Sequence, residues 1–307
     1  LRVEVSGRSL EYLFLGIFHP KGKWVIADVA EVCRGEAVFP HVESDAIYAV
    51  LEKNENGVFA TVDYPFYFDG KQPHFYTPDK EREEKVTLYR KHPLMGWIGI
   101  YLDEICGGRF DFSDMEDFRH LKYTYQVPDT PRICYNEVAL PQQLQCRYVR
   151  YKAMEWKNTN IGELLFWGGK TRYYPETVKG APAENPVNVQ ERMFDDDPLT
   201  YYSTRLPGAT LLMDFGKQVE MDRFIFIPRN DDNFIRIGDT YELYYHDGRN
   251  GWVSLGRKTA SAPELVYDNM PRGALFHLRC LTRGEEEQVF HIKDGKQVFI
   301  SNLSYIR

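Results

Sequence analysis

The chain has 307 residues, a length that corresponds to two or three domains. Its net charge is −7 and the charges are interspersed, so it lacks the basic stripe that a nucleic-acid-binding protein needs. No stretch approaches the ~18 consecutive apolar residues of a membrane-spanning helix. Aromatic residues make up 15% of the chain, and because large rings pack well on a pleated surface, this excess favours strands.

The start of the chain bears on the cellular compartment, which the cysteines do not settle. The chain begins at Leu1, without a Met and inside a strand-like run, which is interpreted as a fragment trimmed from a longer precursor with a signal sequence. We therefore expect an extracytoplasmic location. The five cysteines form no metal-type pair and are interpreted as small buried hydrophobes, with a Cys134–Cys146 disulfide as the alternative.

An internal repeat relates the two ends of the chain. Residues 12–72 and 241–297 share a series of short matches, and the offset stays at 228 residues from Trp24 and Trp252 to Ala46 and Ala274. Such a constant register predicts two small β-modules of common topology. We place them in residues 1–92 and 236–307, on either side of a central domain in residues 93–235.

Patterning between these ends predicts an all-β fold, a β-sandwich. The best helical pattern is short and covers residues 78–89. Alternating runs such as residues 211–215 and 224–227 are separated by Gly, Asp, Asn and Pro, as is typical of sandwich strands. Residues 175–186 are rich in Pro, Ala and Gly and are predicted to form a linker.

Two stretches of the central region resemble the discoidin, or coagulation-factor type C, jelly roll of the galactose-binding-like fold. Residues 147–151 (RYVRY) and 160–168 (NIGELLFWG) are similar to the closing strands of that family. Residues 194–202 (FDDDPLTYY) and 212–217 (LMDFGK) are similar to its opening strands. The order is reversed relative to the family, which implies either one circularly permuted jelly roll or two half-domains. The length of the region, that of a whole jelly roll, favours the permuted roll.

The resemblance implies a non-catalytic, carbohydrate-binding region of a larger secreted or surface bacterial protein. Some bacterial proteins of this kind carry a transglutaminase-like domain before such modules. The alternatives are a structural or protein-interaction scaffold for an upstream catalytic domain, and a hydrolase.

Catalytic motifs give little support to the hydrolase. The sequence has no G-x-S-x-G, H-E-x-x-H or P-loop motif. Cys33, His41 and Asp28 could be combined into a triad, but the second repeat has Ser261 and Gly256 at the positions of Cys33 and Asp28. Repeat-specific packing therefore explains them better.

An acidic turn is the candidate metal site. Hard cations such as Ca²⁺ prefer oxygen ligands, and the resemblance implies a structural calcium held by Asp195, Thr200 and Glu163 with the backbone of Asp197. Asp196 stands where the family has a Gly. The alternative is a solvated acidic turn.

The candidate sugar site lies after the strand that ends near residue 228. Planar hydrogen-bonding groups beside an aromatic face are typical of sugar recognition. The alternative is an ordinary Asn/Asp turn. The candidate residues are Arg229, Asn230, Asp232 and Asn233, with Tyr202 and Trp156 as the aromatic partners.

Overall fold

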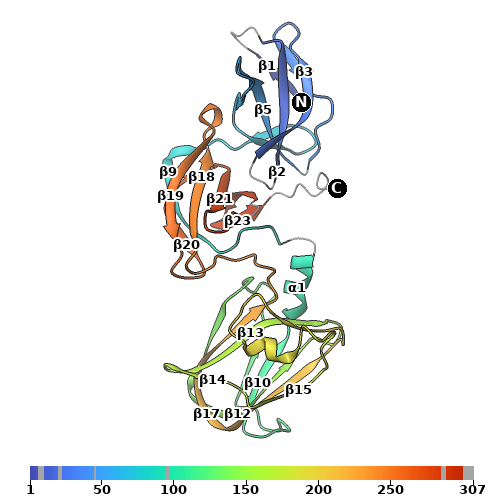
Figure 1. Cartoon of the computed structure of the whole chain (residues 1–307), viewed down its shortest axis with the longest axis vertical. Coiled ribbons are helices and arrows are strands. Elements are labelled where there is room, and N and C mark those ends of the chain that lie inside the picture. The colour runs from blue at the N-terminus through green and yellow to red at the C-terminus, as the bar shows by residue number, and fades with distance from the viewer. Residues whose placement is uncertain (6–9, 20–22, 45, 95–96, 285–287, 300–307) are drawn as a thin grey trace. The chain divides into compact units, whose positions relative to one another are not determined.

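The computed structural model describes residues 1–5, 10–19, 23–44, 46–94, 97–284 and 288–299. The chain divides into two compact units. The first combines Leu1–Pro93 with Ile235–Arg307, and the second is Leu94–Phe234. Strands account for 53% of the structure and helices for 6%, so the fold is all-β as expected (Figure 1). No described helix is long and apolar enough to cross a membrane.

The first repeat builds one sheet with the strand order β3-β2-β5-β7-β8; β6 pairs with β5, and β1 pairs with β4 outside this sheet. Its apolar side chains, among them Leu13, Leu15 and Phe39, form a core of their own. The strands are β1 (Arg2–Glu4), β2 (Tyr12–His19), β3 (Lys23–Glu31), β4 (Glu36–Val38), β5 (Ile47–Lys53), β6 (Phe59–Thr61), β7 (Phe66–Phe68) and β8 (Pro73–Phe75).

The second repeat has the same plan. Its sheet has the order β19-β18-β21-β22-β23, and β9 pairs with β20 outside it. The 3-10 turn η2 (Gly248–Asn250) connects β18 to β19. The strands are β9 (Asp79–Leu88), β18 (Thr240–His246), β19 (Trp252–Thr259), β20 (Leu265–Arg272), β21 (Phe276–Cys280), β22 (Val289–Lys293) and β23 (Lys296–Phe299).

The correspondence of the two repeats extends to the pairing register. In β2–β3 the register shifts between Leu15 and Gly16, and in β18–β19 it shifts between Leu243 and Tyr244, which is the same position at the offset of 228. A β-bulge is a local irregularity that fixes strand bend and twist, so its occurrence at one position in both copies indicates a common fold. The 228-residue offset therefore relates structurally equivalent residues.

The first strand of the second repeat lies where the sequence pattern predicted a helix. Residues 78–89, expected to be a helix, contain β9. Val86 and Leu88 are buried opposite Tyr267 and Leu265 of β20, so pairing with a distant strand outweighs the local helical pattern. The one α-helix described, α1 (Trp97–Ile105), had no clear sequence signal.

The second unit contains an eight-stranded sheet. Its main order is β11-β10-β12-β17-β13-β14, while β15 pairs with β17 and β16 pairs with β13. The long strands β12 and β17 pair along most of their length, with two register shifts. The elements are β10 (Arg109–Ser113), β11 (Tyr123–Gln126), β12 (Asn136–Lys152), β13 (Thr159–Gly168), β14 (Thr171–Tyr173), β15 (Thr177–Gly180), the 3-10 helix η1 (Gln190–Phe194), β16 (Tyr202–Thr204) and β17 (Thr210–Pro228).

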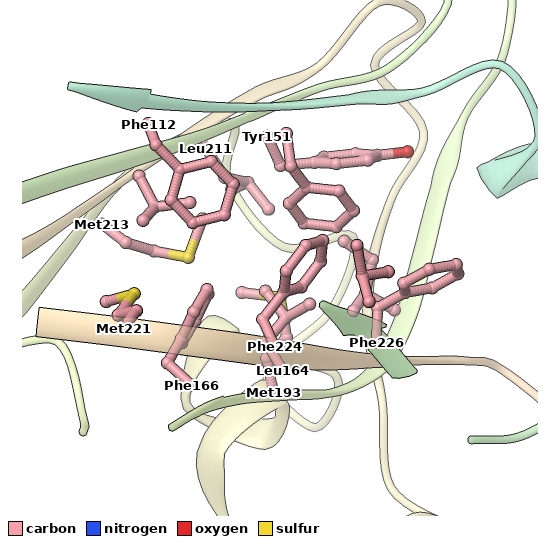
Figure 2. Packing of buried hydrophobic residues seen from close by; sticks show 14 of the residues in the cluster. Phe112, Tyr151, Leu164, Phe166, Met193, Leu211, Met213, Met221, Phe224 and Phe226 are labelled. Atoms are coloured by element: carbon pink, nitrogen blue, oxygen red, sulfur yellow. The ribbon is translucent and has the colours of Figure 1, made fainter. Parts of the chain in front are cut away.

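One hydrophobic core joins the two halves that resemble jelly-roll strands. Leu164 and Phe166 of β13 pack in the same cluster as Met193 and Met213 from beyond the expected linker (Figure 2). Part of the expected linker, residues 175–186, is instead a strand, because it contains β15, which pairs with β17 inside the sheet.

The cysteines carry no disulfide. All five lie in the described part of the chain and are free thiols. Cys134 and Cys146, the pair considered from the sequence, belong to different hydrophobic clusters, which accounts for the absence of a bond between them.

Candidate ligand and metal sites

The acidic turn of the second unit follows η1 directly. The Thr200 hydroxyl donates a hydrogen bond to the Asp195 carboxylate at 2.9 Å, and the Thr200 amide donates to the Asp197 carbonyl at 3.1 Å. Asp196 has a φ of +62°, in the left-handed region where Gly is favoured and Asp is tolerated. An Asp at position 196 is therefore compatible with the backbone of this turn.

Glu163, on β13, is the unusual member of this cluster. It is 1% exposed, and neither of its carboxylate oxygens accepts a hydrogen bond from any described residue. Its ion-pair partner Arg172 is 3.9 Å away and lies closer, at 3.0 Å, to Asp196. Burial, and next the neighbouring Asp195, raise the pKa of Glu163 to about 8. Asp195 is paired with Arg192 at 3.1 Å, so Glu163 is the carboxyl group of this pair with the more distant ionic partner.

The donor set suits a hard cation with few protein ligands. Among the described residues, no three or more His, Cys, Asp or Glu side chains are grouped to hold a metal ion. The cluster instead offers the carboxylates of Glu163 and Asp195, the Thr200 hydroxyl and the Asp197 carbonyl. Ca²⁺ accepts such mixed oxygen ligands and completes its shell with water. The residues present therefore fit calcium.

Arg229, a predicted ligand residue, lies between two aromatic rings. Its guanidinium carbon is 3.5 Å from the ring centroid of Tyr101 on α1 and 4.1 Å from that of Tyr201. Its Nε also donates to Asp231 at 3.1 Å, and its side chain is 17% exposed. Such stacking and pairing fix the guanidinium and fasten α1 to the strand end.

Other residues predicted at this sugar site have internal roles. Asn230 is buried and donates to the Pro198 carbonyl at 2.7 Å, while its side-chain oxygen accepts from the Asp232 amide at 2.9 Å. Asn233 is fully buried, and Asp232 has a φ of +64°. Hydrogen bonds of this kind are typical of an Asn/Asp turn, the alternative interpretation.

The prediction that Tyr202 stacks on a sugar is wrong. It is 0% exposed, belongs to the core of the second unit and donates its hydroxyl to the Ala181 carbonyl at 2.7 Å. The pleat directs a strand residue and its neighbour to opposite faces, so Tyr201 contacts Arg229 while Tyr202 is covered. A ring with no exposed surface cannot stack on a sugar.

Trp156 has the surroundings of a binding residue. It lies between β12 and β13, is 70% exposed, and lines a cavity of about 290 Å³ together with Arg109, Gln126, Lys152 and Glu155. Sequence reasoning missed Arg109 and Gln126, because they come from β10 and β11 and have no sequence proximity to Trp156.

The loop that carries Trp156 is held firmly. The Lys157 amide donates to the Met154 carbonyl at 3.0 Å, and Lys157 Nζ donates to the Asp103 carbonyl on α1 at 2.7 Å.

Comparisons with protein-family models, with curated proteins and with solved structures give no match. A function for this cavity must therefore be inferred from the residues that line it.

Proposed function

We propose that this chain is a non-catalytic carbohydrate-binding region of a larger secreted or surface bacterial protein, and that the Trp156 cavity binds the glycan. The observation that carries the proposal is an exposed indole beside planar polar groups. A sugar presents a C–H face and a rim of hydroxyls. The Trp156 ring suits the first, and the Arg109 guanidinium, Gln126 amide and Glu155 carboxylate suit the second.

The rigidity of the site supports the same function. The Trp156 loop is fastened to α1 through Lys157, so a ligand would not have to order it on binding. The Trp156 indole is 70% exposed, so its face is accessible to a ligand without a change in the loop.

Affinity electrophoresis of the full chain on neutral plant and host polysaccharides tests the proposal. We expect retention on at least one glycan, and Trp156→Ala should abolish it because the stacking face is removed. Trp97→Ala is the matched control, since Trp97 is equally exposed, at 70%, and does not line the cavity. If folded wild-type protein is retained on no glycan, the scaffold role for an upstream domain becomes the better explanation.

We further propose that the acidic turn holds one structural Ca²⁺. Glu163, Asp195, Thr200 and the Asp197 carbonyl would be its protein ligands, and the ion would neutralise the two adjacent carboxylates. The buried Glu163, whose carboxylate oxygens accept no hydrogen bond from a described residue, supports this proposal most directly. The ion would stabilise the turn between η1 and β16, and sugar binding would depend on it only indirectly.

A further inference from the structure

The first unit contains a larger cavity, of about 530 Å³, where its two repeats meet. This volume lies within the range of ~300–1,000 Å³ that is usual for small-ligand pockets. The lining combines aromatic and cationic side chains from both repeats. They include Lys23, Trp24, His246, Arg249 and Trp252.

Trp24 and Trp252 occupy equivalent positions of the two repeats. Trp24 is paired across the strands with Phe18, and Trp252 is paired with His246. The two repeats therefore place a Phe and a His at the same structural position. Phe18 packs edge-on against both indoles, at 5.3 and 5.8 Å between ring centroids. An apolar ring thus suits this position, and the His of the second repeat needs another explanation.

His246 is buried without satisfying its polar atoms. It is 0% exposed, and neither Nδ1 nor Nε2 has a hydrogen-bond partner among the described residues. Its ring packs edge-on against Trp252 at 4.9 Å and Trp24 at 6.0 Å. Burial lowers the pKa of His246 to about 4, so the imidazole is neutral at pH 7. A neutral imidazole has one donor and one acceptor, and because His246 lines the cavity, a ligand that packs into the cavity against the indoles can supply the missing partner.

The charge of the cavity is positive. Lys23 and Arg249 line it, and no Asp or Glu is among its described lining residues. The Arg249 Nε donates to the Val62 carbonyl at 2.8 Å, which holds this side chain in place. The nearby Asp247 carboxylate is already bonded to Lys80 and Asn250, both at 2.8 Å. A ligand that carries a negative charge therefore complements the lining.

We propose that this cavity binds an acidic sugar, namely a hexuronate unit of a polysaccharide. The pyranose ring would pack on the indoles of Trp24 and Trp252, a ring hydroxyl would bond to His246, and the carboxylate would pair with Lys23 and Arg249. The three features of the lining each match one feature of a uronate. The site is separate from the Trp156 cavity and does not depend on it.

Isothermal titration of the full chain with oligogalacturonate, and with a neutral galactose oligomer of equal length, tests the proposal. We expect the uronate to bind at least tenfold more tightly than the neutral oligomer. His246→Phe, which copies the residue of the first repeat, should weaken uronate binding at least tenfold while the circular dichroism spectrum is unchanged. Trp156→Ala, the control in the other unit, should leave uronate binding intact.

A second variant tests the charges at two exposed positions. Lys23 and Arg249 are both exposed, so Lys23→Ala combined with Arg249→Ala should fold normally and bind the uronate at least tenfold more weakly. The proposal would be overturned if the neutral oligomer, or glutarate as a dicarboxylate without a sugar ring, bound as tightly as the uronate. Unchanged uronate binding by His246→Phe would overturn it too. Absence of uronate binding by the wild type would overturn it as well.

Discussion

At the scale of single residues, Glu163 decides how the acidic turn responds to calcium. If Ca²⁺ binds between Glu163 and Asp195, a chelator leaves two adjacent carboxyl groups without the ion that joined them. A ligand that binds only the native state stabilises it by about 2.7 kcal/mol at a hundredfold excess over Kd, which shifts Tm by a few degrees in a unit of this size. We expect EDTA to lower Tm, Ca²⁺ to restore it and Mg²⁺ to substitute poorly, and Asp195→Ala to abolish the response. Differential scanning calorimetry measures this.

The same carboxyl group sets the pH dependence of this response. The pKa of Glu163 is raised from 4.5 to about 8 in the metal-free native state, so between these values the native protein keeps a proton that the unfolded chain has lost. The free energy of unfolding of the metal-free protein therefore falls as pH rises from 4.5 to 8. Calcium needs the ionised form, so its stabilising effect should be larger at pH 8 than at pH 5. In Glu163→Gln, Tm should not respond to calcium at either pH. A Tm that EDTA leaves unchanged in the wild type would contradict the metal site.

The neighbouring tyrosines show what the sequence could tell about single residues. The motif FDDDPLTYY drew attention to this turn, and the structure brings Asp195, Thr200 and Glu163 together there. It could not tell which tyrosine faces outward, because a shift of one residue along a strand exchanges the two faces of the sheet. Tyr201 contacts Arg229, and Tyr202 is part of the core.

At the scale of elements, α1 depends on contacts with other elements. The helix has nine residues, too few to be stable alone, and its residues Leu102 and Ile105 are buried. Arg229, stacked on Tyr101, attaches it to the end of β17. This dependence also explains why the sequence did not reveal α1.

We expect Arg229→Ala to cost about 1–2 kcal/mol of stability and to speed hydrogen exchange at the amides of α1. Arg223→Ala is the matched control, because Arg223 also packs over an aromatic ring, Trp167 at 5.3 Å, but away from α1. It should leave exchange in α1 unchanged. Equal protection of α1 in the wild type and in Arg229→Ala would show that the stacked arginine does not hold the helix.

At the scale of the whole chain, one repeat contains an inserted unit. β9 stands to the second repeat as β1 stands to the first, since β1 pairs with β4 and β9 pairs with β20. In the first repeat, residues 5–11 connect this strand to the next one. In the second, the corresponding connection is residues 89–239, which contain the entire second unit. The sequence offset revealed the repeat from the middle of each copy. It could not reveal the partner of β9, because strand pairing between segments so far apart leaves no local pattern.

This nesting predicts that the two units fold independently. If the second unit is an insertion, the first repeat shows how short the natural connection can be. A chain in which residues 94–234 are replaced by a short Gly/Ser linker should therefore keep the first unit folded, with β9 still paired to β20. Residues 94–234 alone should also fold, since their core is their own. Each fragment should unfold cooperatively in calorimetry, and its amide spectrum should overlay on the matching signals of the full chain.

As a control, a fragment that begins after β9, at residue 94, and ends at residue 307 removes one strand of the second repeat. Without β9, Leu265 and Tyr267 lose the strand that pairs with them, so the amide signals of the C-terminal repeat should disappear. If the linker variant fails to fold while this control fragment keeps a folded C-terminal repeat, β9 is not part of that repeat and the insertion is wrong.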